Sequence, residues 1–139
     1  MHQDYRHNRN FEILAFPCNQ FGSQEPDKEH VIEQKIIKRR GGKYDVEFPM
    51  MSKIEVMGKK AHPLYLWLRK NSSLQGGDMT WNFEKFLING NGNIVSHYSW
   101  DTEPDLIRPD IEKLIGRPWA SSDASLDNPY GPKTVYLIP

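Results

Sequence analysis

The residues with the clearest chemical potential fall in two short segments that lie far apart in the sequence. Residues 16–26 read Phe-Pro-Cys-Asn-Gln-Phe-Gly-Ser-Gln-Glu-Pro, and they carry the only cysteine, Cys18, and the amide Gln24. Residues 81–86 read Trp-Asn-Phe-Glu-Lys-Phe, and they supply the indole of Trp81 and the amide of Asn82. A thiol attacks as the thiolate, so nearby N–H donors that stabilise the anion would make it reactive. The two segments therefore indicate thiol chemistry.

Taken together, these segments resemble the glutathione peroxidase family, in the branch that includes the phospholipid hydroperoxidases. Further matches follow in order: residues 52–56 (Ser-Lys-Ile-Glu-Val), Gly58 and residues 61–65 (Ala-His-Pro-Leu-Tyr). The resemblance extends over about residues 11–115. It implies an α/β, thioredoxin-like fold, in which helices flank a mixed sheet.

The resemblance also implies roles for three side chains. Gln24, Trp81 and Asn82 match family positions that donate hydrogen bonds to a reactive sulfur or selenium. In the family that nucleophile lies N-terminal to the first segment, at the end of a central strand that a helix follows. Too few residues precede Phe16 to hold this strand and helix, so we expect the first strand–helix unit to be missing and the sheet to have a gap. A missing central strand would leave backbone groups of its neighbours unpaired.

Cys18 has two interpretations. It could substitute for the missing nucleophile, or it could be a small core residue, because free cysteine is commonly buried and inert. A family cysteine at this place often accompanies the nucleophile without replacing it, and we favour the inert interpretation. The chain has no second cysteine, so an intramolecular disulfide cycle is excluded. Gln24 and Trp81 also have structural alternatives, as a brace for the loop and as a core aromatic residue.

Composition narrows the class of protein. The 139 residues fit one domain, and 18 Lys plus Arg balance 18 Asp plus Glu, which argues against nucleic acid as an obligatory partner. A single cysteine excludes an internal disulfide framework and favours a reducing compartment. No apolar run is long enough for a membrane span, and the histidines are too scattered for a metal site. We expect an intracellular protein, in the cytoplasm or the mitochondrion.

Hydrophobic periodicity and turn residues predict the secondary structure. The expected elements are a buried strand at 11–16, helices at 26–40, 62–70 and 103–115, a strand-like segment at 52–56, and a hairpin of strands 83–88 and 94–98. The predicted organisation is a lead-in at residues 1–10, a domain at 11–116 and an extended tail at 117–139. Within that tail, residues 134–138 could dock as a strand.

The sequence is compatible with two functions. We expect a glutathione peroxidase-like domain that is catalytically degenerate and acts as a structural or interaction subunit of a larger assembly, where a protein partner covers the incomplete sheet and orders the tail. The alternative is an active thiol-dependent peroxidase that reduces hydrogen peroxide or lipid hydroperoxides in the response to oxidative stress. That activity would need an upstream cysteine or Cys18, with glutathione or thioredoxin as reductant. No cofactor is expected otherwise.

Overall fold

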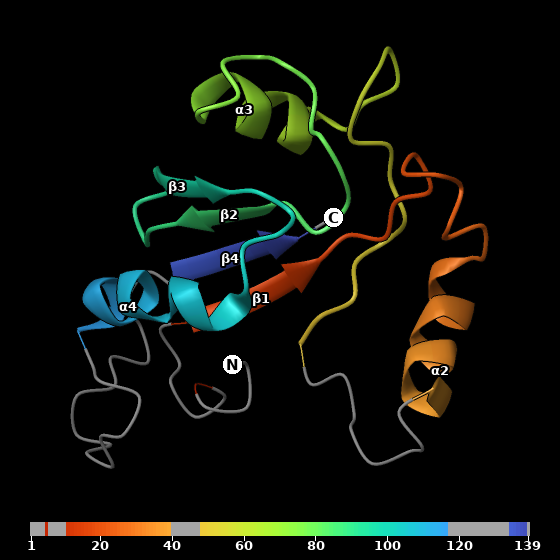
Figure 1. The fold of residues 1–139 in the computed structure, drawn as a ribbon, viewed down its shortest axis with the longest axis horizontal. Helices are drawn as coiled ribbons and strands as arrows, with labels where there is room; N and C mark the ends of the chain where they lie inside the picture. The colour runs from red at the N-terminus through yellow and green to blue at the C-terminus, as the bar shows by residue number, and fades with distance from the viewer. Residues whose placement is uncertain (1–4, 6–10, 40–47, 117–133, 139) are drawn as a thin grey trace.

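The computed structural model describes residue 5 and residues 11–39, 48–116 and 134–138. Its centre is a four-stranded mixed sheet in the order β1-β4-β2-β3 (Figure 1). The strands are β1 (Phe11–Ala15), β2 (Lys85–Ile88), β3 (Ile94–Tyr98) and β4 (Thr134–Ile138). β4 runs parallel to β1, whereas β2 runs antiparallel to both β4 and β3.

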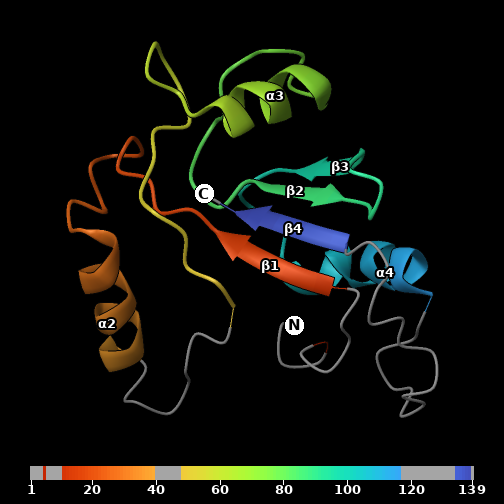
Figure 2. The same cartoon turned by 180° about the vertical axis from the view of Figure 1, so that it is seen from behind.

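The sheet is accompanied, within the described ranges, by the helices α2 (Glu29–Arg39), α3 (Pro63–Asn71) and α4 (Pro104–Ile115). α2 lies to one side of the sheet, away from α4 (Figures 1 and 2). The other two helices, α3 and α4, pack on opposite faces of the sheet. Successive side chains of a strand point to opposite faces, so neighbouring residues of one strand contact different helices. Phe86 and Ile88 of β2 join the cluster with α3, whereas Leu87 between them joins the cluster with α4. The sheet is thus covered on both faces.

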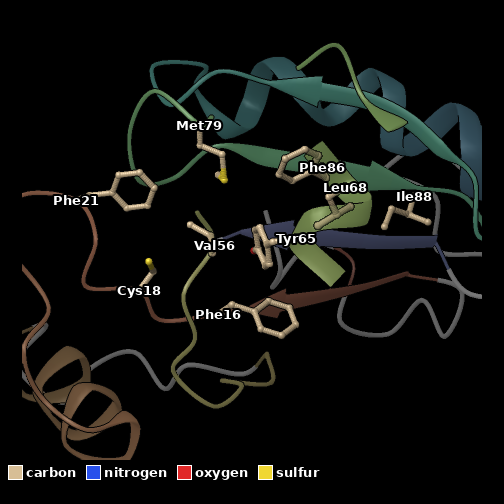
Figure 3. Close-up of a cluster of buried hydrophobic side chains, with 9 residues drawn as sticks. All are labelled: Phe16, Cys18, Phe21, Val56, Tyr65, Leu68, Met79, Phe86 and Ile88. Atoms are coloured by element: carbon tan, nitrogen blue, oxygen red, sulfur yellow. The ribbon is translucent and has the colours of Figure 1, made fainter. Parts of the chain in front are cut away.

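The α3 cluster forms the larger buried core (Figure 3). Its buried members are Phe16, Cys18, Phe21, Val56, Tyr65, Leu68, Met79, Phe86 and Ile88. The buried members of the α4 cluster are Tyr5, Phe11, Ile13, Leu87, Ile107 and Ile111. At about 25 cal/mol for each Å² of apolar surface, burial of these side chains is the main term that holds the helices to the sheet.

Local signals explain where most elements begin and end. The imidazole Nδ1 of His62 accepts a hydrogen bond from the backbone N–H of Leu64 (3.2 Å), which caps α3. Gly116 ends α4 in the left-handed conformation (φ 67°), as predicted. The predicted hairpin is confirmed, but β2 begins at Lys85 and not at residue 83. The reason is Phe83, whose φ of 59° is incompatible with an extended strand.

Two further expectations need adjustment. Helix α2 begins at Glu29, three residues later than expected at Pro26. The segment 52–56 is no strand: the backbone pairing here is an isolated bridge between Met50 and Ala15, and the N–H of Ile54 then donates to the carbonyl of Pro17 (3.0 Å). It therefore follows the end of β1 without extending the sheet.

The central strand comes from the far end of the chain. The sequence indicates that residues 134–138 could form a docking strand. In the structure, Thr134–Ile138 forms β4 and pairs with both β1 and β2. Among the described residues, β1 and β2 do not pair with each other, so β4 fills the place where the resemblance implied a gap. Residues 117–133 of the expected tail lie outside the described part, and the expected protein partner stays a prediction. None of the described helices is long and apolar enough to cross a membrane.

Candidate functional site

Gln24 lies in the loop that follows β1. Gly22 and Ser23 both have positive φ angles (62° and 54°), and they turn the chain so that Gln24 faces solvent. Three side-chain hydrogen bonds fasten the loop beyond this turn, and one of them runs from Lys53 to the carbonyl of Glu25 (2.5 Å). The side-chain oxygen of Asn19 accepts from the N–H of Glu25 (3.0 Å), and Lys53 donates to the carbonyl of Asp27 (3.0 Å).

Trp81 and Asn82 lie in the loop that precedes β2, and a buried carboxylate holds that loop. One oxygen of Glu84 accepts hydrogen bonds from the backbone N–H of Thr80, from the Thr80 hydroxyl (2.7 Å) and from the N–H of Trp81 (3.2 Å). Glu84 is only 1% exposed. The loop conformation is therefore fixed from inside, and it leaves Trp81 39% exposed and Asn82 half-buried.

The structure brings all three predicted donors together. The Asn82 amide donates to the side-chain oxygen of Gln24 (3.4 Å), although 58 residues separate the two in sequence. The Trp81 ring packs against Phe21, with 6.0 Å between ring centroids. A Cβ added to Gly22 would lie 3.5 Å from both the Gln24 side chain and the Trp81 ring, so Gly22 is in close contact with both. An indole N–H donor and two amides thus share one solvent-facing end of the sheet.

Glu84 continues into a network that the sequence did not reveal. Its second oxygen pairs with Nε2 of His97 on β3 (2.7 Å), and Nδ1 of His97 contacts the hydroxyl of Ser73 (2.8 Å) in the loop after α3. Burial alone would raise the pKa of Glu84, but the hydrogen bonds from His97, Thr80 and Trp81 outweigh it and lower the pKa. A glutamate directly before a buried strand was the available signal, because such a carboxylate needs partners.

Cys18 is placed differently from the other three site candidates. It is 7% exposed and lies among the apolar side chains of the α3 cluster (Figure 3). Its sulfur is 3.7 Å from Oε1 of Gln20, and that amide oxygen also accepts the N–H groups of Val56 (2.7 Å) and Met57 (2.9 Å). Burial raises the pKa of the Cys18 thiol, and hydrogen bonds from Gln20 and Val56 offset only part of this rise. These surroundings favour the neutral thiol over the nucleophilic thiolate.

Within the described ranges, no group of three or more histidine, cysteine or acidic side chains is arranged to hold a metal ion. The side chains that meet at the candidate site, two amides and an indole, are neutral hydrogen-bond donors. Converging amide and indole N–H groups stabilise an anion that forms beside them, in the manner of an oxyanion hole.

Comparison with known proteins points to one family. The family model described as glutathione peroxidase matches residues 1–69. The chain is 41% identical over 118 residues to a probable phospholipid hydroperoxide glutathione peroxidase of Mesembryanthemum crystallinum, covering 84% of this chain and 66% of that protein. It is 45% identical over 106 residues to the chloroplastic phospholipid hydroperoxide glutathione peroxidase 1 of Arabidopsis thaliana, covering 76% of this chain and 43% of that protein. The chain thus spans less than two thirds of the length of these relatives.

A solved structure has a similar fold. The crystal structure of Trgpx in apo form superimposes with a TM-score of 0.51 at 33% sequence identity. The match covers 81% of this chain and 85% of that one. The fold is therefore thioredoxin-like, with helices on both faces of the mixed sheet, as the sequence predicted.

Proposed function

Because the chain belongs to the glutathione peroxidase family, we propose that Gln24, Trp81 and Asn82 form the hydrogen-bonding part of a site for thiol-dependent peroxide reduction. The proposed substrates are hydrogen peroxide and lipid hydroperoxides, and the names of two relatives include phospholipid hydroperoxide. The observation that carries the proposal is the contact between Asn82 and Gln24 beside Trp81.

The three donors would act on the sulfur that attacks the peroxide. N–H groups directed at a thiolate lower its pKa, and they also stabilise the negative charge that develops on the leaving oxygen. The attacking sulfur takes one oxygen, the O–O bond breaks, and the second oxygen leaves as an alcohol or water after protonation. A first reducing thiol then condenses with the sulfenic acid, which forms a disulfide and releases water, and a second reducing thiol cleaves that disulfide and restores the attacking thiol.

In this proposal the attacking thiol is not Cys18, the only cysteine of the 139 residues, so the thiol is supplied from outside them. The burial and raised pKa of Cys18 disfavour the thiolate, and its sulfur already contacts Gln20. A suitable position for a thiol is the end of β4, because Ile138 is opposite Ala15 and Leu137 is opposite Phe86. The end of β4 therefore reaches the same end of the sheet as the loops that carry Gln24 and Asn82.

A second candidate function is a structural one, without turnover. The observation in its favour is that the only cysteine of the sequence is the core residue Cys18. On this alternative the chain is a catalytically degenerate glutathione peroxidase-like domain within a larger assembly, and the amide contact only braces the two loops.

Placing a thiol directly after β4 separates the two functions. We expect Pro139→Cys to reduce hydrogen peroxide in a coupled thiol-dependent assay, whereas the unchanged chain and Cys18→Ser show equally low rates. Adding Gln24→Ala or Asn82→Ala to Pro139→Cys should lower the new rate by about 10-fold or more, as loss of an oxyanion donor does. The structural function is supported if Pro139→Cys has no activity. It is also supported if replacing Gln24 or Asn82 by alanine leaves the rate of Pro139→Cys unchanged. Turnover that Cys18→Ser abolishes would show that Cys18 is the nucleophile after all.

A further inference from the structure

Among the residues that the structure describes, the sheet consists of two parts that share no backbone pairing with each other. One part is β1, which pairs with β4 and, in the same described ranges, has one further bridge, to Met50. The other is the β2–β3 hairpin. Every strand-to-strand hydrogen bond between these parts, within the described residues, runs through β4. The place between β1 and β2, called the groove below, is filled by β4 and takes one extended segment.

The segment that fills the groove has a sequence typical of a strand. It is separated in sequence from the preceding helix by a connecting segment. Thr134–Ile138 reads Thr-Val-Tyr-Leu-Ile, an uncharged run of residues that favour extended backbone. Residues 117–133 connect it to α4 and contain Pro118, Pro129 and Pro132. When such a segment is unpaired, its backbone groups are available to pair with the edge strand of another sheet.

Backbone pairing specifies the direction and register of a strand but not the molecule that supplies it. A segment that runs parallel to β1 and antiparallel to β2 makes the same hydrogen bonds whether it comes from its own chain or from a second copy. Exchange between copies thus needs no new interface, which is the usual condition for domain swapping.

We propose that the groove between β1 and β2 is a strand-accepting interface, that two copies of the chain exchange β4 through it, and that filling it assembles the Gln24–Asn82 pair. Gln24 follows β1 and Asn82 precedes β2, so the two amides belong to the parts that β4 joins. The inference rests on the proposed function only where it treats the Gln24–Asn82 pair as part of a peroxide-reducing site. Its readouts need no turnover, so its failure would differ from a failure of the peroxidase assay.

Tyr136→Pro in the full chain tests the role of β4. Proline removes a ladder N–H in mid-strand, at the residue that is opposite both Ile13 and Leu87. We expect the side-chain amide NMR signals of Gln24 and Asn82 to lose their native positions. A synthetic peptide of residues 131–139 should restore them in a saturable way, even if the variant alone is unfolded. The same peptide with proline at position 136 is the matched control and should restore nothing.

Exchange between copies is tested by native mass spectrometry. Isotope-labelled and unlabelled wild-type chains, unfolded and refolded together at high concentration, should give dimers of mixed mass, whereas Tyr136→Pro should give none. The proposal is overturned if the variant keeps the native amide signals, if the peptide fails to restore them, or if the wild-type mixture contains only monomers.

Discussion

Two loops meet at one end of the sheet, and each buries its most reactive side chain while it exposes a neutral donor. The loop after β1 buries Cys18 in the core and leaves Gln24 in solvent. The loop before β2 buries Glu84 and leaves Trp81 partly exposed. The thiol and the carboxylate thus serve as anchors, and the neutral donors form the surface of the candidate site. The anchors differ in kind, because Cys18 is held by packing and Glu84 by hydrogen bonds.

The hydrogen-bonded anchor should give the larger loss when it is removed. Glu84→Ala leaves the N–H groups of Thr80 and Trp81 and the ring of His97 without their acceptor. Breaking one side of such a buried pair costs about 3–5 kcal/mol of the free energy of unfolding. Urea denaturation at pH 7 measures it. Glu33→Ala, which removes an exposed carboxylate on α2, is the matched control and should cost under about 0.5 kcal/mol.

The same anchor should depend on pH with a defined sign. The pKa of Glu84 is lowered in the folded state from an ordinary value of 4.5. Its contribution is therefore fully present above pH 4.5 and is lost as the pH falls through the lowered folded value. The difference in stability between the wild type and Glu84→Gln should shrink over that range. A difference that stays constant down to pH 3 would contradict a charged anchor.

Replacing the packed anchor, Cys18, should cost less free energy of unfolding than replacing Glu84. The Cys18 thiol should also react slowly with alkylating agents. Cys18→Ser places a hydroxyl among apolar side chains and should cost about 1–3 kcal/mol. Because burial raises the pKa of the thiol, alkylation of native Cys18 by iodoacetamide at pH 7 should be much slower than alkylation in urea. Mass spectrometry follows both rates. Rapid alkylation of the native protein would remove the contrast between anchor and donor.

The sequence predicted those parts of the molecule that depend on neighbouring residues. Hairpin turn residues and the helix-ending Gly116 depend on local backbone preference, and both were found as predicted. The donors Gln24, Trp81 and Asn82 were found through the family motifs, and the structure brings them together.

Long-range pairing could not be predicted in the same way. The position of β4 between β1 and β2 depends on backbone hydrogen bonds to strands far away in the sequence. The network of Glu84, His97 and Ser73 joins three separate segments, so the local pattern shows that Glu84 needs partners but does not identify them. The positive φ of Phe83, which shortens β2, is likewise imposed by the loop and not by its own preference.

The finest test of the contrast between anchors and donors concerns Gly22, which contacts both exposed donors without being an anchor. Its φ of 62° disfavours any other residue, so Gly22→Ala should cost about 1 kcal/mol. Gly58→Ala is the matched control, because Gly58 has a similar φ of 77° but nothing within 4 Å of an added Cβ. Both variants should lose similar stability in urea denaturation. Only Gly22→Ala should shift the side-chain amide signals of Gln24 and Asn82, since its new methyl group touches the Gln24 side chain and the Trp81 ring. Equal spectra for the two variants would mean that the donors are positioned by the anchors alone.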